Sequence, residues 1–263
     1  MFVPKTNKVL YWQQEKDDIS IGFTMRQEGC SAYPENSLNM GLHIEDDENL
    51  VIRNREMVAE DTGVPLDDWI LAEQVHGTEI ELVTESDRGR GARDLHTAIQ
   101  GADGLITNKE NTLLAGFYAD CVPLYFMDPV TDWIGIAHAG WKGSVNGMAH
   151  RMVEAMSSCG ANVETLTMII GPSISGDVYT VDERVSAQVD ERYRPYVLKQ
   201  IGENAWGLDL KELNKRVAME AGIKEENVFT SSFCTYKEEE LFFSHRRDEG
   251  QTGRMLGFIV RSK

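Results

Sequence analysis

Basic residues are scarce in this chain of 263 residues. Its 26 lysines and arginines face 43 aspartates and glutamates, so the formal net charge is −17 at pH 7. A surface this acidic repels nucleic-acid phosphates and anionic lipid surfaces. We therefore expect no nucleic-acid partner and no membrane binding, and a small phosphate would need a local basic pocket.

The sequence also lacks long hydrophobic runs and paired cysteines. No segment approaches the roughly 20 apolar residues of a membrane-spanning helix, and no apolar run near the first residues resembles a signal sequence. The four cysteines form no Cys-x-x-Cys pair, which argues against a disulfide framework; they are Cys30, Cys121, Cys159 and Cys234. These absences predict a protein of the reducing cytoplasm.

No internal repeat or linker divides the chain, so residues 1–263 are interpreted as one domain. Apolar residues at helical spacing predict helices at 49–62, 145–156 and 210–221. A polar, glycine-rich stretch predicts a loop at 84–101. Helices and strands alternate irregularly, which favours mixed α+β layers over a Rossmann sheet. Strands are predicted at 80–83, 104–107, 113–118, 124–127, 133–137, 167–170 and 258–260.

Three residues with metal-binding side chains, His76, Cys121 and His138, each follow an apolar run. Each stands where a strand passes into a loop, a position from which reacting groups commonly project. Two imidazoles and one thiolate match a catalytic zinc site, whose fourth position stays open. The long spacings follow no local rule, however. A buried structural cysteine and two core or surface histidines fit the same residues.

The segment after His138 has features of an anion-binding turn. It reads AGWKGS, with two glycines that allow close backbone approach and Lys142 as a positive charge. The helix that follows would offer free N–H groups and the positive end of its dipole. The spacing is not that of a P-loop. A tight strand-to-helix turn without any ligand explains the segment equally well.

Arginines that suit a phosphate occur in two places. Arg246 and Arg247 lie in the run FSHRRD near the C-terminus, and Arg26 lies in TMRQEG near the N-terminus. Arginine binds phosphate through two parallel hydrogen bonds, so the C-terminal pair fits a phosphate pocket. A solvated ion-pair patch is the alternative for that pair, and Arg26 alone is a weak indicator.

Seven motifs occur in order and together resemble the YfiH/YlmD-type family, also called the laccase-domain or polyphenol-oxidase-like family. The resemblance extends from about Phe23 to Ile259. The motifs are SLNMG at 37–41, QVHG at 74–77, ADG at 102–104, ADCVP at 119–123, AHAGWKG at 137–143, GPSI at 171–174 and FSHRRD at 243–248.

The resemblance implies a fold and a metal site. Members share a compact α+β architecture of packed β-sheets flanked by helices, similar to the CNF1/YfiH-like class. The family's ligand positions are occupied here by His76, Cys121 and His138. The resemblance therefore implies one zinc ion per chain, and Cu²⁺ is a candidate substitute because copper competes well for such ligands.

The resemblance also implies an activity. Family members are described as purine nucleoside phosphorylases that split adenosine, inosine and S-methyl-5'-thioadenosine with phosphate, and that also deaminate adenosine. We therefore expect purine nucleosides and phosphate as partners of a monomer or homodimer. Asp120, beside Cys121, is the candidate proton relay. The candidate phosphate- or substrate-binding residues are Arg26, Lys142, Gly143 and Arg246.

Two positions depart from the family pattern. Glu28-Gly29-Cys30 stands where the early motif usually has paired glycines after the arginine. Lys142 stands where arginine is common, and lysine lacks the planar fork that binds phosphate in a bidentate way. Neither position is an expected metal ligand.

Other functions remain as alternatives. A laccase-like copper oxidase normally needs many histidines in His-x-His pairs, whereas this chain has six and no two lie within two positions. A metal-free cysteine hydrolase would use Cys121 as nucleophile and a histidine as base. A non-catalytic partner protein agrees least with the clustering of reactive residues.

Overall fold

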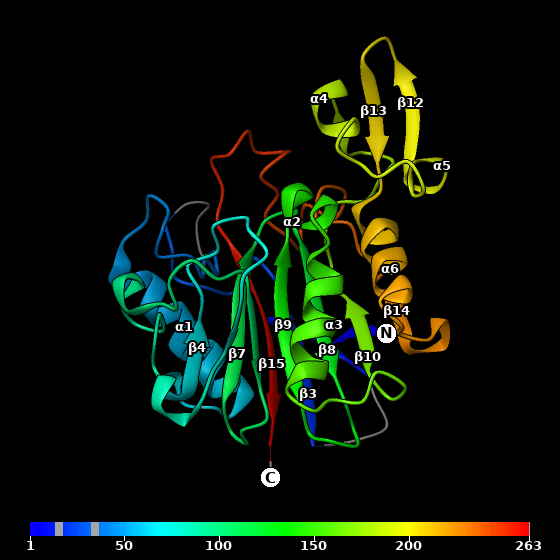
Figure 1. Cartoon of the computed structure of the whole chain (residues 1–263). Coiled ribbons are helices and arrows are strands. Elements are labelled where there is room, and N and C mark those ends of the chain that lie inside the picture. Colours follow the sequence, from blue (N-terminus) through cyan, green and yellow to red (C-terminus); the bar gives the residue numbers. More distant parts are fainter. Residues whose placement is uncertain (14–17, 33–36, 263) are drawn as a thin grey trace.

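Two six-stranded β-sheets stack face to face, and helices cover their outer faces (Figure 1). This computed structural model describes residues 1–13, 18–32 and 37–262. Packed sheets flanked by helices confirm the predicted α+β fold. None of the helices in the described part is long and apolar enough to span a membrane.

Both sheets are mixed. The pairs β4–β7, β5–β6 and β10–β14 are parallel and the remaining pairs are antiparallel. The first sheet has the order β1 (Phe2–Pro4), β2 (Val9–Trp12), β3 (Ile19–Thr24), β15 (Met255–Arg261), β7 (Leu113–Tyr118) and β4 (Trp69–Leu71). The second has the order β14 (Val228–Thr230), β10 (Thr167–Ile170), β8 (Val122–Met127), β9 (Ile134–Ala139), β6 (Gly104–Thr107) and β5 (Ile80–Leu82).

A third, small sheet lies outside the stack. It has the order β11 (Thr180–Val181), β13 (Ala205–Leu208) and β12 (Leu198–Gly202). Figure 1 shows the β12–β13 hairpin projecting beyond α6, away from the two large sheets.

The helices α1 (Glu48–Thr62), α2 (Trp141–Val145), α3 (Met148–Ser158) and α6 (Leu210–Glu220) lie against the two large sheets (Figure 1). The short helices α4 (Glu183–Ser186) and α5 (Arg194–Val197) lie beside the small third sheet instead. Short 3-10 turns occupy Leu66–Asp68, Glu85–Asp87, Leu95–Thr97 and Glu225–Asn227. The Asp47 carboxylate caps α1 by accepting from the Asn49 N–H, and Gly63 ends it at a φ of 71°. The helix predicted at 49–62 is thus confirmed to within one residue.

The single helix predicted at 145–156 is wrong at its start. The chain forms α2 and α3 instead, because Gly147 between them has a φ of 79°. This left-handed conformation interrupts the helical hydrogen-bond pattern and suits glycine. The apolar face was identified correctly, since Met148, Met152 and Met156 are buried against the second sheet.

Two buried tyrosines join the large sheets to each other. The Tyr118 hydroxyl, from β7, donates to the carbonyl oxygen of Ala137 in β9 at 3.2 Å. The Tyr125 hydroxyl, from β8, donates to the carbonyl oxygen of Gly22 in β3 at 3.1 Å. Both phenols therefore bury their rings between the sheets without leaving an unpaired polar group.

One of the connections between the two large sheets is only three residues long and contains Cys121. Residues 119–121 connect β7 of the first sheet to β8 of the second. Cys121 is the last residue of this link. The predicted chemistry therefore lies at an end of the stack, where both sheets contribute residues.

Candidate metal centre

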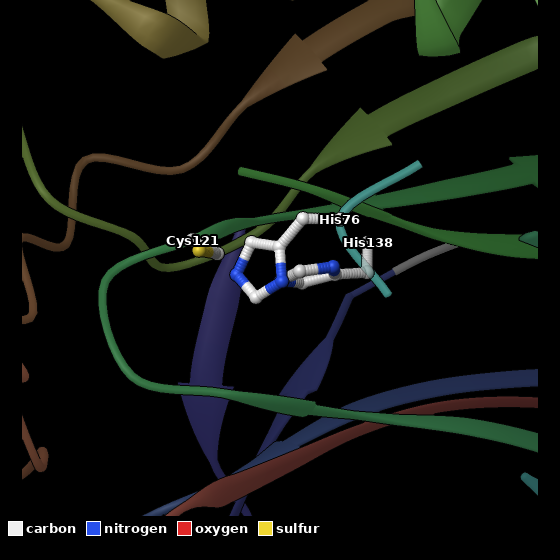
Figure 2. Close-up of side chains that lie close together, drawn as sticks. All are labelled: His76, Cys121 and His138. Atoms are coloured by element: carbon white, nitrogen blue, oxygen red, sulfur yellow. The ribbon is translucent and has the colours of Figure 1, made fainter. Parts of the chain in front are cut away.

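The three predicted ligands come together at this end of the stack. His76 lies in the loop after β4, Cys121 ends the β7–β8 link, and His138 lies near the end of β9. Their ligand atoms all lie within 4.8 Å of one another. Figure 2 shows the side chains gathered at one point, with the His76 ring between Cys121 and His138 in this view. His138 is buried, Cys121 half-buried and His76 exposed.

Cys121 is presented by a strained residue. Asp120, just before it, has a φ of 82°, which is unfavourable for a residue with a Cβ. The Asp120 carboxylate accepts from the Thr235 hydroxyl at 2.7 Å, the Ser244 hydroxyl at 2.9 Å and the Arg246 N–H at 2.7 Å. These three bonds hold the strained conformation and tie the C-terminal segment to Cys121.

His76 lies in a similarly constrained loop. Gln74 and His76 both have a φ of 60°. The Gln74 side chain pairs with the main chain of Phe117, donating to its carbonyl oxygen at 3.0 Å and accepting from its N–H at 2.7 Å. The Asp103 carboxylate accepts from three successive N–H groups in this loop, at residues 75–77.

His138 is oriented by the same aspartate. Its Nδ1 lies 2.8 Å from Oδ1 of Asp103, so the ring donates from Nδ1 and leaves Nε2 for a metal. Ile134 and Ile136, on the same face of β9, are buried between the sheets, as strand alternation predicted.

The electrostatics favour a charged pair between Cys121 and His138. Burial alone would raise the pKa of the Cys121 thiol, but the charge and hydrogen bonds of His138 and His76 together lower it below its ordinary value. Burial alone would lower the pKa of His138, but Cys121 and the Asp103 carboxylate raise it. The thiolate is the form of cysteine that binds metals.

Close packing explains the glycines after His138. A Cβ on Gly140 would lie 3.1 Å from Cδ2 of His76 and 3.2 Å from Sγ of Cys121. A Cβ on Gly143 would lie 3.3 Å from the carbonyl oxygen of Gly77. The glycine-rich turn therefore lets the backbone approach the three candidate ligands.

A cavity of about 850 Å³ opens on the three candidate ligands, within the size range of small-molecule sites. Phe117 and His43 lie in one part of its lining, with ring centroids 5.4 Å apart. Burial, followed by the charges of Arg254 and Arg55, lowers the pKa of His43 to about 4, so this ring is neutral at pH 7. Five of the chain's six histidines line the cavity: His43, His76, His96, His138 and His245.

The cavity lining also includes one of the predicted arginines. The Arg246 guanidinium lies 4.8 Å from the centroid of the Tyr179 ring and donates to the carbonyl oxygen of Thr180 at 2.7 Å. Arg246 is exposed and lines the cavity. Arg247 instead donates to the carbonyl oxygens of residues 235, 236 and 242 and pairs with Asp248. The adjacent arginines therefore have different roles, and only Arg246 lines the cavity.

Two predicted anion-binding residues lie apart from this lining. The Arg26 guanidinium stacks on Phe243 at 5.0 Å and donates to the carbonyl oxygen of Glu239. Lys142 is exposed, with its ammonium 5.8 Å from the centroid of the Trp141 ring. Trp141 lines the cavity, whereas the described lining includes neither Lys142 nor Arg26.

Sequence reasoning did not assign a role to Asp103, His43 or Tyr179. The motif ADG at 102–104 was a signal for Asp103, but its contacts depend on the pairing of β6 with β9. No signal marked His43 or Tyr179, because their place in the cavity depends on how distant loops pack.

Comparisons with known proteins agree over nearly the whole chain. The family described as multi-copper polyphenol oxidoreductase laccase matches residues 20–262. Purine nucleoside phosphorylase YlmD of Bacillus subtilis (strain 168) is 43% identical, over 97% of this chain and 94% of its own. The crystal structure of Bacillus licheniformis hypothetical protein YfiH has a TM-score of 0.95 and 41% identity, covering 100% of this chain and 99% of that one. YlmD from Geobacillus stearothermophilus has a TM-score of 0.94 and 40% identity, with the same coverage.

Proposed function

The chain belongs to the YfiH/YlmD-type family, and on that premise we propose that it is a purine nucleoside phosphorylase that uses one zinc ion per chain. One observation carries the proposal: His76, Cys121 and His138 converge on a cavity of about 850 Å³ that Arg246 also lines. The names of the curated relatives supply the reaction class.

The three residues fit a zinc ion. Cysteine and histidine are preferred zinc ligands, and three protein ligands leave one position open for chemistry. Nδ1 of His138 already forms a hydrogen bond with Asp103, so Nε2 is the ring nitrogen available to bind zinc. Gly140 leaves room beside His76 and Cys121 that a side chain would fill. When bound, zinc would supply a Lewis acid at this edge of the cavity.

Phosphorolysis of a purine nucleoside exchanges one bond for another at C1' of the ribose. A phosphate oxygen bonds to C1' while the C1'–N9 bond breaks, and its electron pair leaves with the purine, which takes up a proton. The protein must hold an anion close to the sugar, and Arg246 is the residue we assign to it. We propose adenosine, inosine and S-methyl-5'-thioadenosine as substrates.

The other predicted residues receive more limited roles. Gly143 allows the turn to pack closely, and Lys142 and Arg26 would act on phosphate only from outside the described cavity lining. We assign Asp120 a positioning role rather than proton transfer, because its carboxylate already accepts three hydrogen bonds and one comes from the Arg246 N–H.

We also propose that the same site deaminates adenosine. This reaction adds water at C6 of the purine and releases ammonia, so it needs an activated water and a proton carrier. His245 and His96 line the same cavity, and we propose that one of them carries the proton. Zinc held by His76, Cys121 and His138 would supply the activated water.

Two alternative functions, a copper oxidase and a cysteine hydrolase, can be distinguished from a zinc-dependent phosphorylase. An electron-relaying multicopper oxidase needs several metal centres, and within the described residues only His76, Cys121 and His138 form such a cluster. A cysteine hydrolase is favoured by the proximity of Cys121 to His138, since their charges stabilise a thiolate. A hydrolase of this kind would keep its activity in the presence of a metal chelator and would lose it when Cys121 is alkylated.

Metal and product analysis of the same sample tests the proposal. Protein purified without added metal should contain about one zinc per chain. With phosphate, adenosine should yield adenine and ribose 1-phosphate, and chelation should abolish this reaction. Protein without stoichiometric metal, or nucleoside cleavage that does not depend on phosphate, would contradict it. A His76→Ala variant that keeps its full metal content would contradict the ligand assignment.

A further inference from the structure

We propose that Asp103 is the positioning residue that sets the two histidine ligands relative to each other. This inference rests on the proposed metal at His76, Cys121 and His138. Asp103 lies just before β6, outside the set of proposed ligands, and its side chain is fully buried. Its carboxylate contacts the loop of one histidine and the ring of the other.

One oxygen of Asp103 serves both histidines. Oδ1 accepts the backbone N–H of His76 at 3.0 Å and lies 2.8 Å from Nδ1 of His138. The first bond fixes where the His76 main chain lies, and the second fixes the orientation and tautomer of the His138 ring. A single atom thus links the backbone of one ligand to the side chain of the other.

The second oxygen secures the loop that carries His76. Oδ2 accepts from the N–H groups of Val75 at 3.1 Å and Gly77 at 2.7 Å. His76 between them has a φ of 60°, which costs energy for a residue with a Cβ. The carboxylate therefore compensates for an unfavourable backbone conformation at a proposed ligand.

The position of Asp103 is itself fixed by the second sheet. Its N–H donates to the carbonyl oxygen of Glu79 at 3.0 Å, and its carbonyl oxygen accepts from the His138 N–H at 2.8 Å. The pairing of β6 with β9 continues directly from this contact. The exposed loop of His76 is thus held against the rigid strand that carries His138.

The chemistry of the carboxylate predicts that asparagine does not replace it. A carboxylate accepts through both oxygens, whereas an amide accepts through one and donates through its nitrogen. In Asp103→Asn the amide nitrogen, itself a donor, would replace one oxygen and face N–H groups that need an acceptor. Removing such an outer partner of a metal-bound histidine typically lowers metal affinity by about 10- to 100-fold.

The test compares zinc affinity in wild type, Asp103→Asn and Asp128→Asn, by titrating metal-free protein against a chromophoric chelator. Asp128 is a matched control: it is buried, accepts from residues 130, 131, 162 and 165, and follows β8 at the end opposite Cys121. We expect a loss of about 10- to 100-fold in Asp103→Asn and unchanged affinity in Asp128→Asn, although both should lower the melting temperature.

A spectroscopic readout separates positioning from general damage. Co²⁺ in place of zinc absorbs visible light according to its coordination geometry, so Asp103→Asn should change the spectrum and Asp128→Asn should not. If Asp103→Asn does not fold, the same comparison is made with Asp103→Glu, which keeps the charge but displaces both oxygens.

The outcomes distinguish a failure of the proposed zinc-dependent function from a failure of the inference about Asp103. Wild-type protein that binds no zinc would overturn the proposed function and this inference together. Wild-type protein that binds zinc, with a variant at Asp103 of equal affinity and unchanged Co²⁺ spectrum, would overturn the inference alone. Equal losses in the variants at Asp103 and Asp128 would also overturn it, because a general loss of stability would then explain both.

Discussion

At the scale of single residues, Cys121 differs from the other cysteines because two histidines surround its sulfur. We predict that Cys121→Ser loses most zinc and most activity, since serine is rarely deprotonated and binds zinc weakly. Zinc content and phosphorolysis should be measured together, with Cys159→Ser as the control for a half-buried cysteine outside the cluster. Zinc retained without activity would favour a nucleophilic Cys121, and both retained would refute its assignment.

Arg246 and Arg26 offer a second comparison. Each guanidinium stacks on an aromatic ring and donates to a backbone carbonyl, but only Arg246 lines the cavity. We predict that Arg246→Ala raises the KM for phosphate by roughly 10- to 100-fold, the equivalent of one charge-assisted hydrogen bond of about 1.5–3 kcal/mol.

Initial rates at varied phosphate and fixed inosine measure the effect. Arg26→Ala should leave the KM for phosphate within about twofold of wild type, because surface charges remote from a site contribute little. Equal effects of the two substitutions would remove Arg246 from the phosphate site.

At the scale of elements, the turn from β9 into α2 determines how closely the backbone approaches the three candidate ligands. We predict that Gly140→Ala weakens zinc binding, because its methyl group would crowd His76 and Cys121 and overpacking costs about 1–3 kcal/mol. Zinc affinity by chelator competition is the measurement.

Gly63→Ala is the control for this prediction. Gly63 ends α1 at a φ of 71° with no other atom within 4 Å of an added Cβ. It should lose about 1–2 kcal/mol of stability from its left-handed backbone while keeping wild-type zinc affinity. Wild-type zinc affinity in Gly140→Ala would contradict the prediction, because it would mean that the turn shifts to accommodate the methyl group.

The elements predicted correctly share a strong local signal. The long apolar runs of β7 and β8 and the capped, periodic helices α1 and α6 are clear in the sequence. The strands β1, β2 and β4 were missed because they are short, and β1 ends in proline. β3 is as long as β7 and β8, but it was missed because Gly22 weakens its strand pattern. The exposed hairpin β12–β13 was missed because β12 buries little and shows no alternation.

The candidate site was only partly visible in the sequence. Residue types at His76, Cys121 and His138 allowed a metal site, but the resemblance to a family was needed to choose it. The contacts of Asp103 depend on the pairing of β6 with β9, and the separation of Arg246 from Arg26 depends on the packing of loops far apart in sequence. Such information is tertiary and has no local pattern.

At the scale of the whole molecule, Tyr118 and Tyr125 join the two large sheets to each other through buried hydrogen bonds. We propose that residues 1–263 form one cooperative domain, since the core between the sheets is built from both. Differential scanning calorimetry should show a single transition whose midpoint rises with zinc, by mass action on the folded state. Two separate transitions, or a midpoint independent of zinc, would contradict this.

The link between the sheets has a consequence for how the protein is made. The loop of His76 follows a strand of the first sheet, His138 belongs to the second, and Cys121 stands where the chain passes between them. β15, which joins β3 to β7, comes last in the chain. A nascent chain therefore has all three ligands long before the first sheet is whole. If these residues bind zinc as proposed, lasting capture of the ion has to wait until β15 joins the first sheet, so metal retention would report that this sheet is complete.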